Sequence, residues 1–137
     1  MSCCLRILGE ELDVDSLVAE INIKPYKIWK KGDRRFPAGY NSNEIFCLSG
    51  ITYIASDADM DDFECQLEEA TEFLLEHHAA FKKIKTFLGV DQVVLDFAVQ
   101  LQKAAINSDY LPPEFLGLLG ELGIGLELSH FSYVDTD

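Results

Sequence analysis

The chain has 137 residues, 48% hydrophobic and 26% charged, the composition of one soluble globular domain spanning residues 1–137. No apolar run approaches the ~20 residues of a membrane helix, and the N-terminal residues lack the basic flank and apolar stretch of a secretory signal, so a cytoplasmic protein is expected. The formal net charge of −13 disfavours binding to nucleic-acid backbones and to anionic membranes, both of which would repel the protein.

The first half of the chain predicts three strands and one helix. Apolar alternation predicts a strand over residues 2–8, and a helix that Asp13 or Asp15 can cap is predicted to run to about Ile21. Pro25 stops this helix, because the residue before a proline is pushed out of the α region. A second strand is predicted over 26–30 and, after a loop, an aromatic and β-branched third strand over 44–55.

The second half is organised by the longest helical pattern in the chain, over residues 61–88. Apolar side chains recur there at three- and four-residue steps, which places them on one face of a helix. That face consists of Phe63, Leu67, Ala70, Leu74, Phe81, Ile84 and Leu88. A strand over 93–101 follows, then a helix over 112–122 that a proline pair opens, and a final strand over 124–128.

The predicted order of elements is β-α-β-β-α-β with an α-β appended. The first six elements match a ferredoxin-like split βαβ core, so the predicted class is α+β with the helices mainly on one face of the sheet. The other face is expected to be partly solvated, because the last two strands alternate apolar with polar residues.

The four cysteines do not have the spacing of a disulfide framework or of a zinc site. Cys3 and Cys4 are adjacent and point to opposite faces of a strand, while Cys47 and Cys65 stand alone without a Cys-x-x-Cys pair. Free thiols in a reducing cytosol are therefore predicted, and no metal ion or other cofactor is expected.

Charge is unevenly distributed along the chain. Residues 24–35 hold six of the eleven lysines and arginines, whereas outside that segment five bases face 23 acids. Residues 57–76 contain nine acids and no base. The basic segment, with Tyr26 and Trp29, has the composition of a single-strand RNA contact, but lysines that protect an edge strand from aggregation are the preferred interpretation.

An acidic stripe on the long helix is the predicted binding surface for a basic protein partner. Its glutamates recur at four-residue steps, and like charges at that spacing cost roughly 0.2–0.5 kcal/mol per pair. A helix that needed only solubility would usually intersperse lysines. An exposed Leu75 would act as an apolar anchor, and three aspartates would flank the stripe. The predicted contacts are Asp57, Asp59, Asp61, Glu64, Glu68, Glu72, Leu75 and Glu76.

Part of the same segment mimics the register of a calcium loop. Asp57, Asp59 and Asp61, with Glu68 at the twelfth position, supply the carboxylates that such a loop needs. However, Asp62 stands where the sharp turn of the loop requires glycine. Capping of a helix and favourable charge in its first turn are therefore preferred to a metal site.

No catalytic constellation stands out in the sequence. There is no nucleophile elbow, no phosphate-binding loop and no evident acid–base pair, so an enzyme is not expected. His77 and His78 are adjacent and would lie about 100° apart on a helix, which makes a shared metal ion unfavourable.

Two short motifs follow predicted elements, Ile23-Lys24-Pro25 after the first helix and Lys31-Gly32-Asp33 after the second strand. Phe46-Cys47-Leu48-Ser49 lies in the third strand, and Leu111-Pro112-Pro113-Glu114-Phe115-Leu116 is the entry of the last helix. With a first strand that ends at Gly9, they resemble the pattern of a bacterial family, domain-of-unknown-function family 4279. The likeness spans most of the chain and departs at Phe46, where tryptophan is expected. The family offers no established activity, but the resemblance implies similarity to small immunity proteins encoded beside bacterial toxins.

Two functions are weighed on these observations. The first is a non-enzymatic cytoplasmic immunity or antitoxin-type protein that neutralises a basic bacterial toxin by occlusion, with complementary charge speeding association. The second is a small-ligand-binding or regulatory module that uses the polar sheet face and the loop around Trp29 as a cleft. The sequence does not indicate the oligomeric state.

Overall fold

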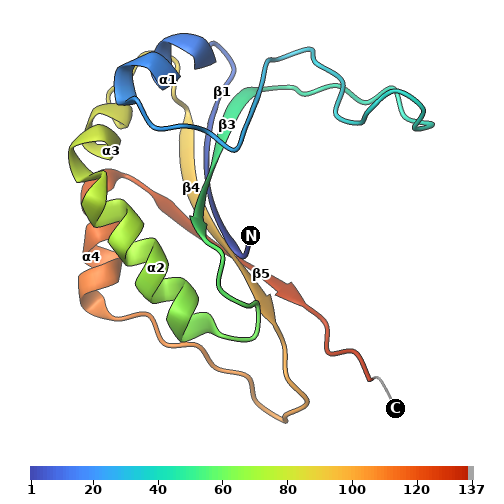
Figure 1. The fold of residues 1–137 in the computed structure, drawn as a ribbon, viewed down its shortest axis with the longest axis vertical. Helices are drawn as coiled ribbons and strands as arrows, with labels where there is room; N and C mark the ends of the chain where they lie inside the picture. Colours follow the sequence, from blue (N-terminus) through green and yellow to red (C-terminus); the bar gives the residue numbers. More distant parts are fainter. Residues whose placement is uncertain (136–137) are drawn as a thin grey trace.

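A five-stranded sheet forms the centre of the computed structural model, which describes residues 1–135 (Figure 1). The last two residues of the predicted domain 1–137 lie outside the described residues. The strands are β1 (Cys3–Gly9), β2 (Lys27–Trp29), β3 (Ser49–Ser56), β4 (Gln92–Gln100) and β5 (Gly125–Phe131). Their order in the sheet is β2-β3-β1-β4-β5, and every neighbouring pair is antiparallel except β4 and β5.

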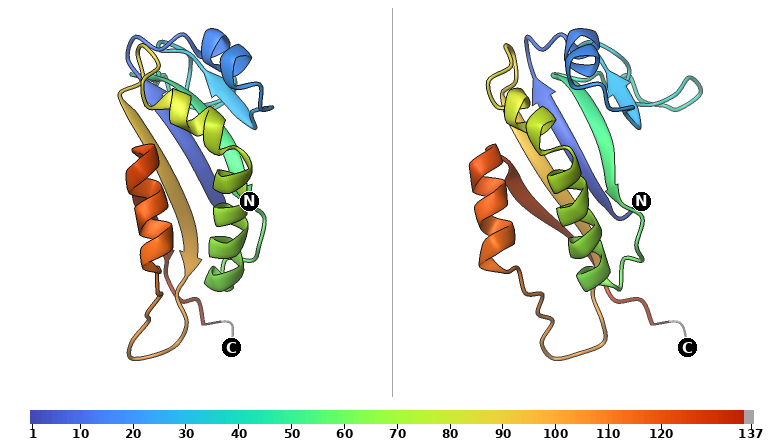
Figure 2. Two further views of the ribbon diagram at one scale, coloured as in Figure 1. Left: turned by 90° about the vertical axis from the view of Figure 1, so that its left-hand side faces the viewer. Right: turned by 60° about the vertical axis from the view of Figure 1, so that its left-hand side comes forward.

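The helices cover one face of this sheet (Figure 2). They are α1 (Val14–Ile21), α2 (Phe63–Glu76), α3 (His78–Ile84) and α4 (Pro113–Leu122). α4 connects the parallel strands β4 and β5, since a parallel pair requires a crossover rather than a hairpin. The class is therefore mixed α+β, as predicted. None of the helices within the described residues is long and apolar enough to cross a membrane.

The alternation of side chains along the strands separates the core from an open face. On β1, Leu5 and Ile7 are fully buried beneath the helices, whereas Arg6 between them points to the other side and is partly exposed. On β4, Leu95 is fully buried and Asp96 is partly exposed. One face of the sheet thus carries the hydrophobic core, and the other presents polar side chains to solvent.

The complete sheet differs in strand order from the four-stranded ferredoxin-like sheet. A fifth strand, β5, lies beyond β4 and runs parallel to it, with Leu95 opposite Leu126 and Asp96 opposite Glu127. The helix and strand that the sequence predicts as an appendage therefore extend the sheet itself and form one of its edges.

The single long helix predicted over residues 61–88 is wrong, because two helices, α2 and α3, replace it. At His77 the backbone leaves the helical conformation, with φ −108° and ψ 24°. The ring centroids of Phe73 and Phe81 lie 5.2 and 6.0 Å from that of His77, so aromatic packing holds the bend. Leu88, predicted on the buried face, lies beyond the end of α3 and is 91% exposed.

The third strand predicted over residues 44–55 is also too long at its start. Residues 31–48 form an arm that projects from the edge of the sheet (Figure 1). One isolated β-bridge, between Arg34 and Ile45, joins the two halves of this arm. Phe46 stacks on the ring of Trp29 outside the core. Residues 44–48 therefore do not extend β3.

Candidate functional site

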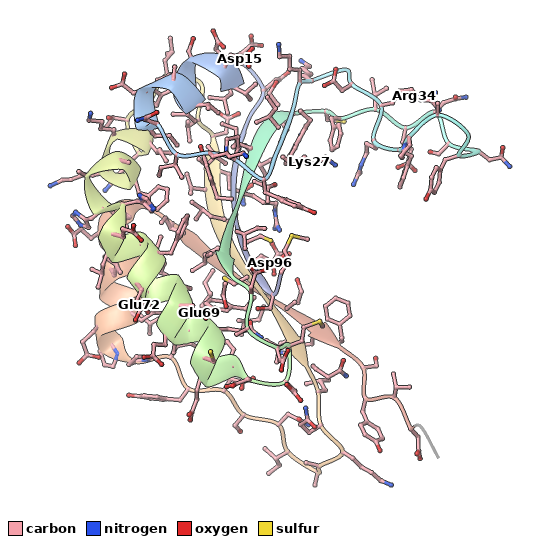
Figure 3. All side chains as sticks on the ribbon, in the orientation of Figure 1. Asp15, Lys27, Arg34, Glu69, Glu72 and Asp96 are labelled. Carbon is pink, nitrogen blue, oxygen red and sulfur yellow. The ribbon has the colours of Figure 1, made fainter. Side chains whose placement is uncertain are left out.

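The structure places the four predicted glutamates on the solvent-facing side of α2. Glu64, Glu68, Glu72 and Glu76 are all exposed, and Figure 3 shows Glu72 on this helix. Within residues 1–135 no lysine or arginine forms an ion pair with any of them. The ion-pair contact of this row is with His77, whose Nε2 lies 4.0 Å from the Glu76 carboxylate. This side of α2 is therefore a negatively charged surface with no base interspersed.

The three aspartates predicted as a flank have different environments. The carboxylate of Asp57 lies 2.9 Å from the N-terminal ammonium group of Met1, which compensates its charge. Asp59 is exposed, and its backbone carbonyl accepts a hydrogen bond of 3.0 Å from the side-chain amide of Gln66. Asp61 is exposed and lies two residues before α2. The three do not form one continuous flank, and Asp61 is the member that adjoins the helix.

The start of α2 is a capped helix terminus. The side chain of Asp62 accepts a hydrogen bond of 3.1 Å from the backbone N–H of Cys65, as an N-cap residue does. In the part of the chain that the structure describes, no three His, Cys, Asp or Glu side chains are placed to hold a metal ion. The hydrogen bond to Asp62 thus agrees with the interpretation of this segment as a capped helix start.

Leu75 lies on the exposed side of α2 and lines an apolar groove. Its side chain is 58% exposed, and the groove, of about 410 Å³, lies between α2 and α4. Phe115 and Leu118 contribute apolar surface, while Glu114 and Glu121 add carboxylates on the α4 side. The sequence does not indicate the contribution of α4, because it depends on how the two helices pack.

A second group of charged side chains lies on the open face of the sheet, with Arg6 at its centre. Arg6 Nη1 donates to Asp96 Oδ2 at 2.8 Å and Arg6 Nη2 donates to Glu127 Oε2 at 2.7 Å. Ser129 Oγ donates to Asp96 Oδ1 at 2.7 Å. Burial by itself lowers the pKa of the Arg6 guanidinium, but the hydrogen bonds and charges of Asp96 and Glu127 outweigh it and the pKa is raised. Arg6 therefore remains charged.

Sequence reasoning did not identify this group as a unit. The available signal was that each residue falls on the polar side of a strand with alternating character. Which strands lie side by side, and hence which of these side chains meet, follows only from the order β1-β4-β5 in the sheet. Figure 3 shows Asp96 on this sheet, away from Glu69 and Glu72 of α2.

An aromatic pair lies beside this group, at the base of the arm. The indole of Trp29 crosses β3 over Gly50, where a Cβ atom would overlap the ring and would lie 2.9 Å from Leu8 Cδ2. The indole N–H donates to the carbonyl oxygen of Leu48 at 3.1 Å. The ring of Phe46 stacks on the indole with centroids 5.1 Å apart. The absence of a side chain at Gly50 is therefore what lets Trp29 lie flat on the sheet.

The same residues line a pocket on the open face, which we call the sheet-face pocket. Its volume is about 370 Å³. The lining residues are Arg6, Leu8, Trp29, Arg35, Ile45, Phe46, Cys47 and Leu48. The sequence predicts a cleft formed by the polar sheet face and the loop around Trp29, and the structure adds Phe46 and Arg6 to its lining.

Comparison with known proteins supports a family assignment over nearly the whole chain. The family model described as Domain of unknown function (DUF4279) matches residues 1–132. The matched range includes every helix and strand described above. No curated protein and no solved structure matches the chain.

Proposed function

The chain belongs to the DUF4279 family of domains of unknown function, and we propose that this protein is a non-enzymatic acidic binding protein that captures a basic protein partner. The observation that carries the proposal is the row of exposed glutamates on α2, which surrounds an exposed Leu75 and contains no base. Like charges at four-residue steps are unfavourable in an isolated helix, and the apolar groove beside Leu75 exposes surface that a partner would cover. A partner of opposite charge would compensate both features.

The chemistry of the surface specifies the partner segment that would fit it. Lysines or arginines would face Glu68 and Glu72 on α2, and an apolar side chain would enter the groove beside Leu75. The carboxylates of Glu114 and Glu121 would receive further basic residues from the same segment. Charge complementarity of this kind mainly raises the association rate, and a buried apolar anchor mainly slows dissociation.

We infer further that the partner is a bacterial toxin or effector domain and that this protein neutralises it by occlusion in the cytoplasm. The resemblance to small immunity proteins supports this part of the proposal. An antitoxin must capture its target quickly, which suits an electrostatically steered encounter of ~10⁸ M⁻¹s⁻¹ or more at low salt.

We also propose the finer fold assignment, a ferredoxin-like core with an appended helix and strand. Its support is the order β2-β3-β1-β4 of the first four strands, each antiparallel to its neighbour, with helices in the β1–β2 and β3–β4 connections. Backbone proton contacts measured by NMR would test it, because a parallel pairing of β1 with β3 would contradict this core.

The test of the function is capture of the product of the adjacent gene by charge-reversed variants. In Glu68→Lys with Glu72→Lys, the association rate should fall at least tenfold at low salt and its salt dependence should flatten. The matched control is Glu11→Lys with Glu44→Lys, which makes the same change in net charge at exposed positions outside α2. Equal association rates for the two double variants would refute α2 as the binding surface.

A second pair of variants tests the apolar part of the surface. Leu75→Ala should raise the dissociation rate at least fivefold, because it removes the side chain that lines the groove. Leu116→Ala removes a comparably exposed leucine of α4 that does not line the groove, and it should leave the dissociation rate within twofold. If both variants dissociate at the wild-type rate, the groove does not take part in capture.

A further inference from the structure

We propose that the sheet-face pocket binds a small organic anion that consists of a carboxylate or phosphate group attached to an apolar ring. The proposal is independent of the partner-binding surface on α2. The pocket residue Arg6 points to the side of β1 opposite its buried residues, whereas the helices cover the other face of the sheet (Figure 2). The proposal rests on the charge of the pocket, the packing of its aromatic residues and its size.

Two cations without a carboxylate partner among the described residues lie at the pocket: Arg35 lines it, and Lys27 lies over the aromatic rings of its wall. Of the basic residues in the segment 24–35, Lys30 pairs with Asp15 at 3.0 Å and Lys31 pairs with Glu10 at 2.9 Å. In residues 1–135, Lys27 and Arg35 form no ion pair. Their charges lie beside the aromatic pair and are available to a ligand.

The aromatic pair holds these two cations at the pocket. Lys27 Nζ lies 5.8 Å from the ring centroid of Trp29 and 5.6 Å from that of Phe46. Arg35 Cζ lies 5.6 Å from the Phe46 centroid. Attraction to the ring faces restricts the two long side chains before a ligand arrives, so an anion would meet cations that are already in place. Figure 3 shows Lys27 beside the sheet, whereas Arg34 lies out on the arm.

The acidic residues near the pocket do not reverse its preference for an anionic ligand. Asp96 and Glu127 lie beside the pocket residue Arg6, and both accept hydrogen bonds from its guanidinium. The acids of α2 lie on the other side of the sheet, and charges separated by more than about 8 Å are largely screened at physiological salt. A cationic ligand would instead meet Arg6, Lys27 and Arg35 together.

The remaining walls and the volume restrict the rest of the ligand. Leu8, Ile45 and Leu48 supply apolar surface, and the stacked rings form one side of the pocket. A volume of about 370 Å³ is near the lower limit of small-molecule sites. A single ring with one acidic group fits both the volume and the combination of apolar walls with unpaired cations.

Binding can be followed through Trp29, which is the only tryptophan in the chain and lines the pocket. The full-length protein would be titrated with phenyl phosphate and with benzoate while the tryptophan fluorescence is recorded. We expect a saturable change for at least one of these probes. Benzyl alcohol, which lacks the charge, and inorganic phosphate, which lacks the ring, should each bind at least tenfold more weakly.

Two charge-neutralising variants and a matched control locate the site. Arg35→Gln and Lys27→Gln should each raise the dissociation constant about tenfold, as expected for loss of one charge-assisted contact. Arg34→Gln removes the same charge from the adjacent residue, whose guanidinium instead donates to the carbonyl oxygen of Ser42, and should change the constant less than twofold. Thermal unfolding of all three variants would verify that they fold.

Several outcomes would overturn the proposal. They are no saturable change with either ringed anion at millimolar concentration, equal affinity for inorganic phosphate and phenyl phosphate, or equal effects of Arg34→Gln and Arg35→Gln. Protection of the exposed thiol of Cys47 provides a second readout, since it also lines the pocket. Phenyl phosphate that binds without slowing modification of Cys47 would place the anion elsewhere on the protein. The variants on α2 should leave this titration unchanged, so failure of either proposal can be recognised separately.

Discussion

Arg6 and Asp96 are ninety positions apart in the chain, yet their side chains meet at 2.8 Å on the open face of the sheet. The contact joins β1 to β4, and its partners are only 28% and 18% exposed. In its exposure this ion pair is therefore intermediate between a screened surface pair and a buried pair. The hydrogen bond from Ser129 fixes the second carboxylate oxygen of Asp96.

The first prediction concerns this pair. Asp96→Asn should lower the free energy of unfolding by about 1–2 kcal/mol, because it removes a charge-assisted hydrogen bond and leaves Arg6 without its less exposed partner. Urea unfolding would measure the loss. Lys30→Gln, which breaks the exposed pair with Asp15, is the control and should leave the unfolding midpoint unchanged. A loss of the same size in both variants would contradict a special role for the sheet-face pair.

The second prediction concerns the aromatic core below α3. Phe81 is 2% exposed, so Phe81→Ala should cost about 3–5 kcal/mol of unfolding free energy as an aromatic core deletion. Leu88 belongs to the same periodic pattern in the sequence but is 91% exposed, and Leu88→Ala should cost less than about 0.5 kcal/mol. Thermal or denaturant unfolding of the two variants would distinguish them. Similar losses in both variants would indicate that Leu88 is buried, as the single long helix predicted from the periodicity requires.

The third prediction concerns the buried hydroxyl of Tyr53. The side chain is 1% exposed, and its oxygen has no hydrogen-bond partner within residues 1–135. Tyr53→Phe should therefore maintain or raise the free energy of unfolding, by up to ~1 kcal/mol. A loss of more than ~1 kcal/mol would show that the hydroxyl is hydrogen-bonded in solution.

The same residue predicts a pH dependence. Burial raises the pKa of Tyr53 to about 12, whereas an unfolded tyrosine titrates near its ordinary value of 10.0. Because the folded state keeps its proton longer, its contribution to stability is complete below pH 10 and is lost as the pH rises toward 12. Tyr53→Phe should remove this part of the alkaline decline. Parallel stability curves for the two proteins between pH 9 and 11 would contradict the assignment.

The fourth prediction concerns the stability of the acidic surface. Glu68→Lys with Glu72→Lys replaces like-charge pairs with Glu64 and Glu76 by opposite-charge pairs, so the unfolding free energy should rise by a few tenths of a kcal/mol. The gain should shrink at high salt. Stability that rises while capture of the partner weakens indicates a surface maintained for recognition. A double variant that is less stable would show that these glutamates already have favourable partners in the fold.

The fifth prediction concerns the thiols. Cysteine titration in denaturant without reductant should find four free thiols, in agreement with the unpaired side chains in the structure. In the native protein the exposed Cys47 should react first. Cys3 should react last, since it is fully buried and burial raises its pKa. Recovery of two thiols or none from fresh protein would demonstrate a disulfide.

Local patterns in the sequence were sufficient for the type of most elements. Strict alternation predicts β1 and β4 with their buried faces. Of the two aspartates predicted as possible caps of α1, Asp13 accepts the hydrogen bond from the backbone N–H of Ser16. The periodicity of the long helical pattern did not reveal the bend at His77. No proline or glycine occurs at that point, and the bend accompanies contacts among rings that come from both helices.

By itself, the sequence determined the buried faces of β1 and β4, the α+β class and the row of carboxylates on α2. These features depend on the period of the backbone and on neighbours within a few residues. Only the tertiary structure decided that Arg6 meets Asp96 and Glu127, that Phe46 stacks on Trp29 above Gly50, and that α4 completes the groove beside Leu75. Such contacts join distant parts of the chain, and strand order and helix packing bring them together because the whole core must be buried at once.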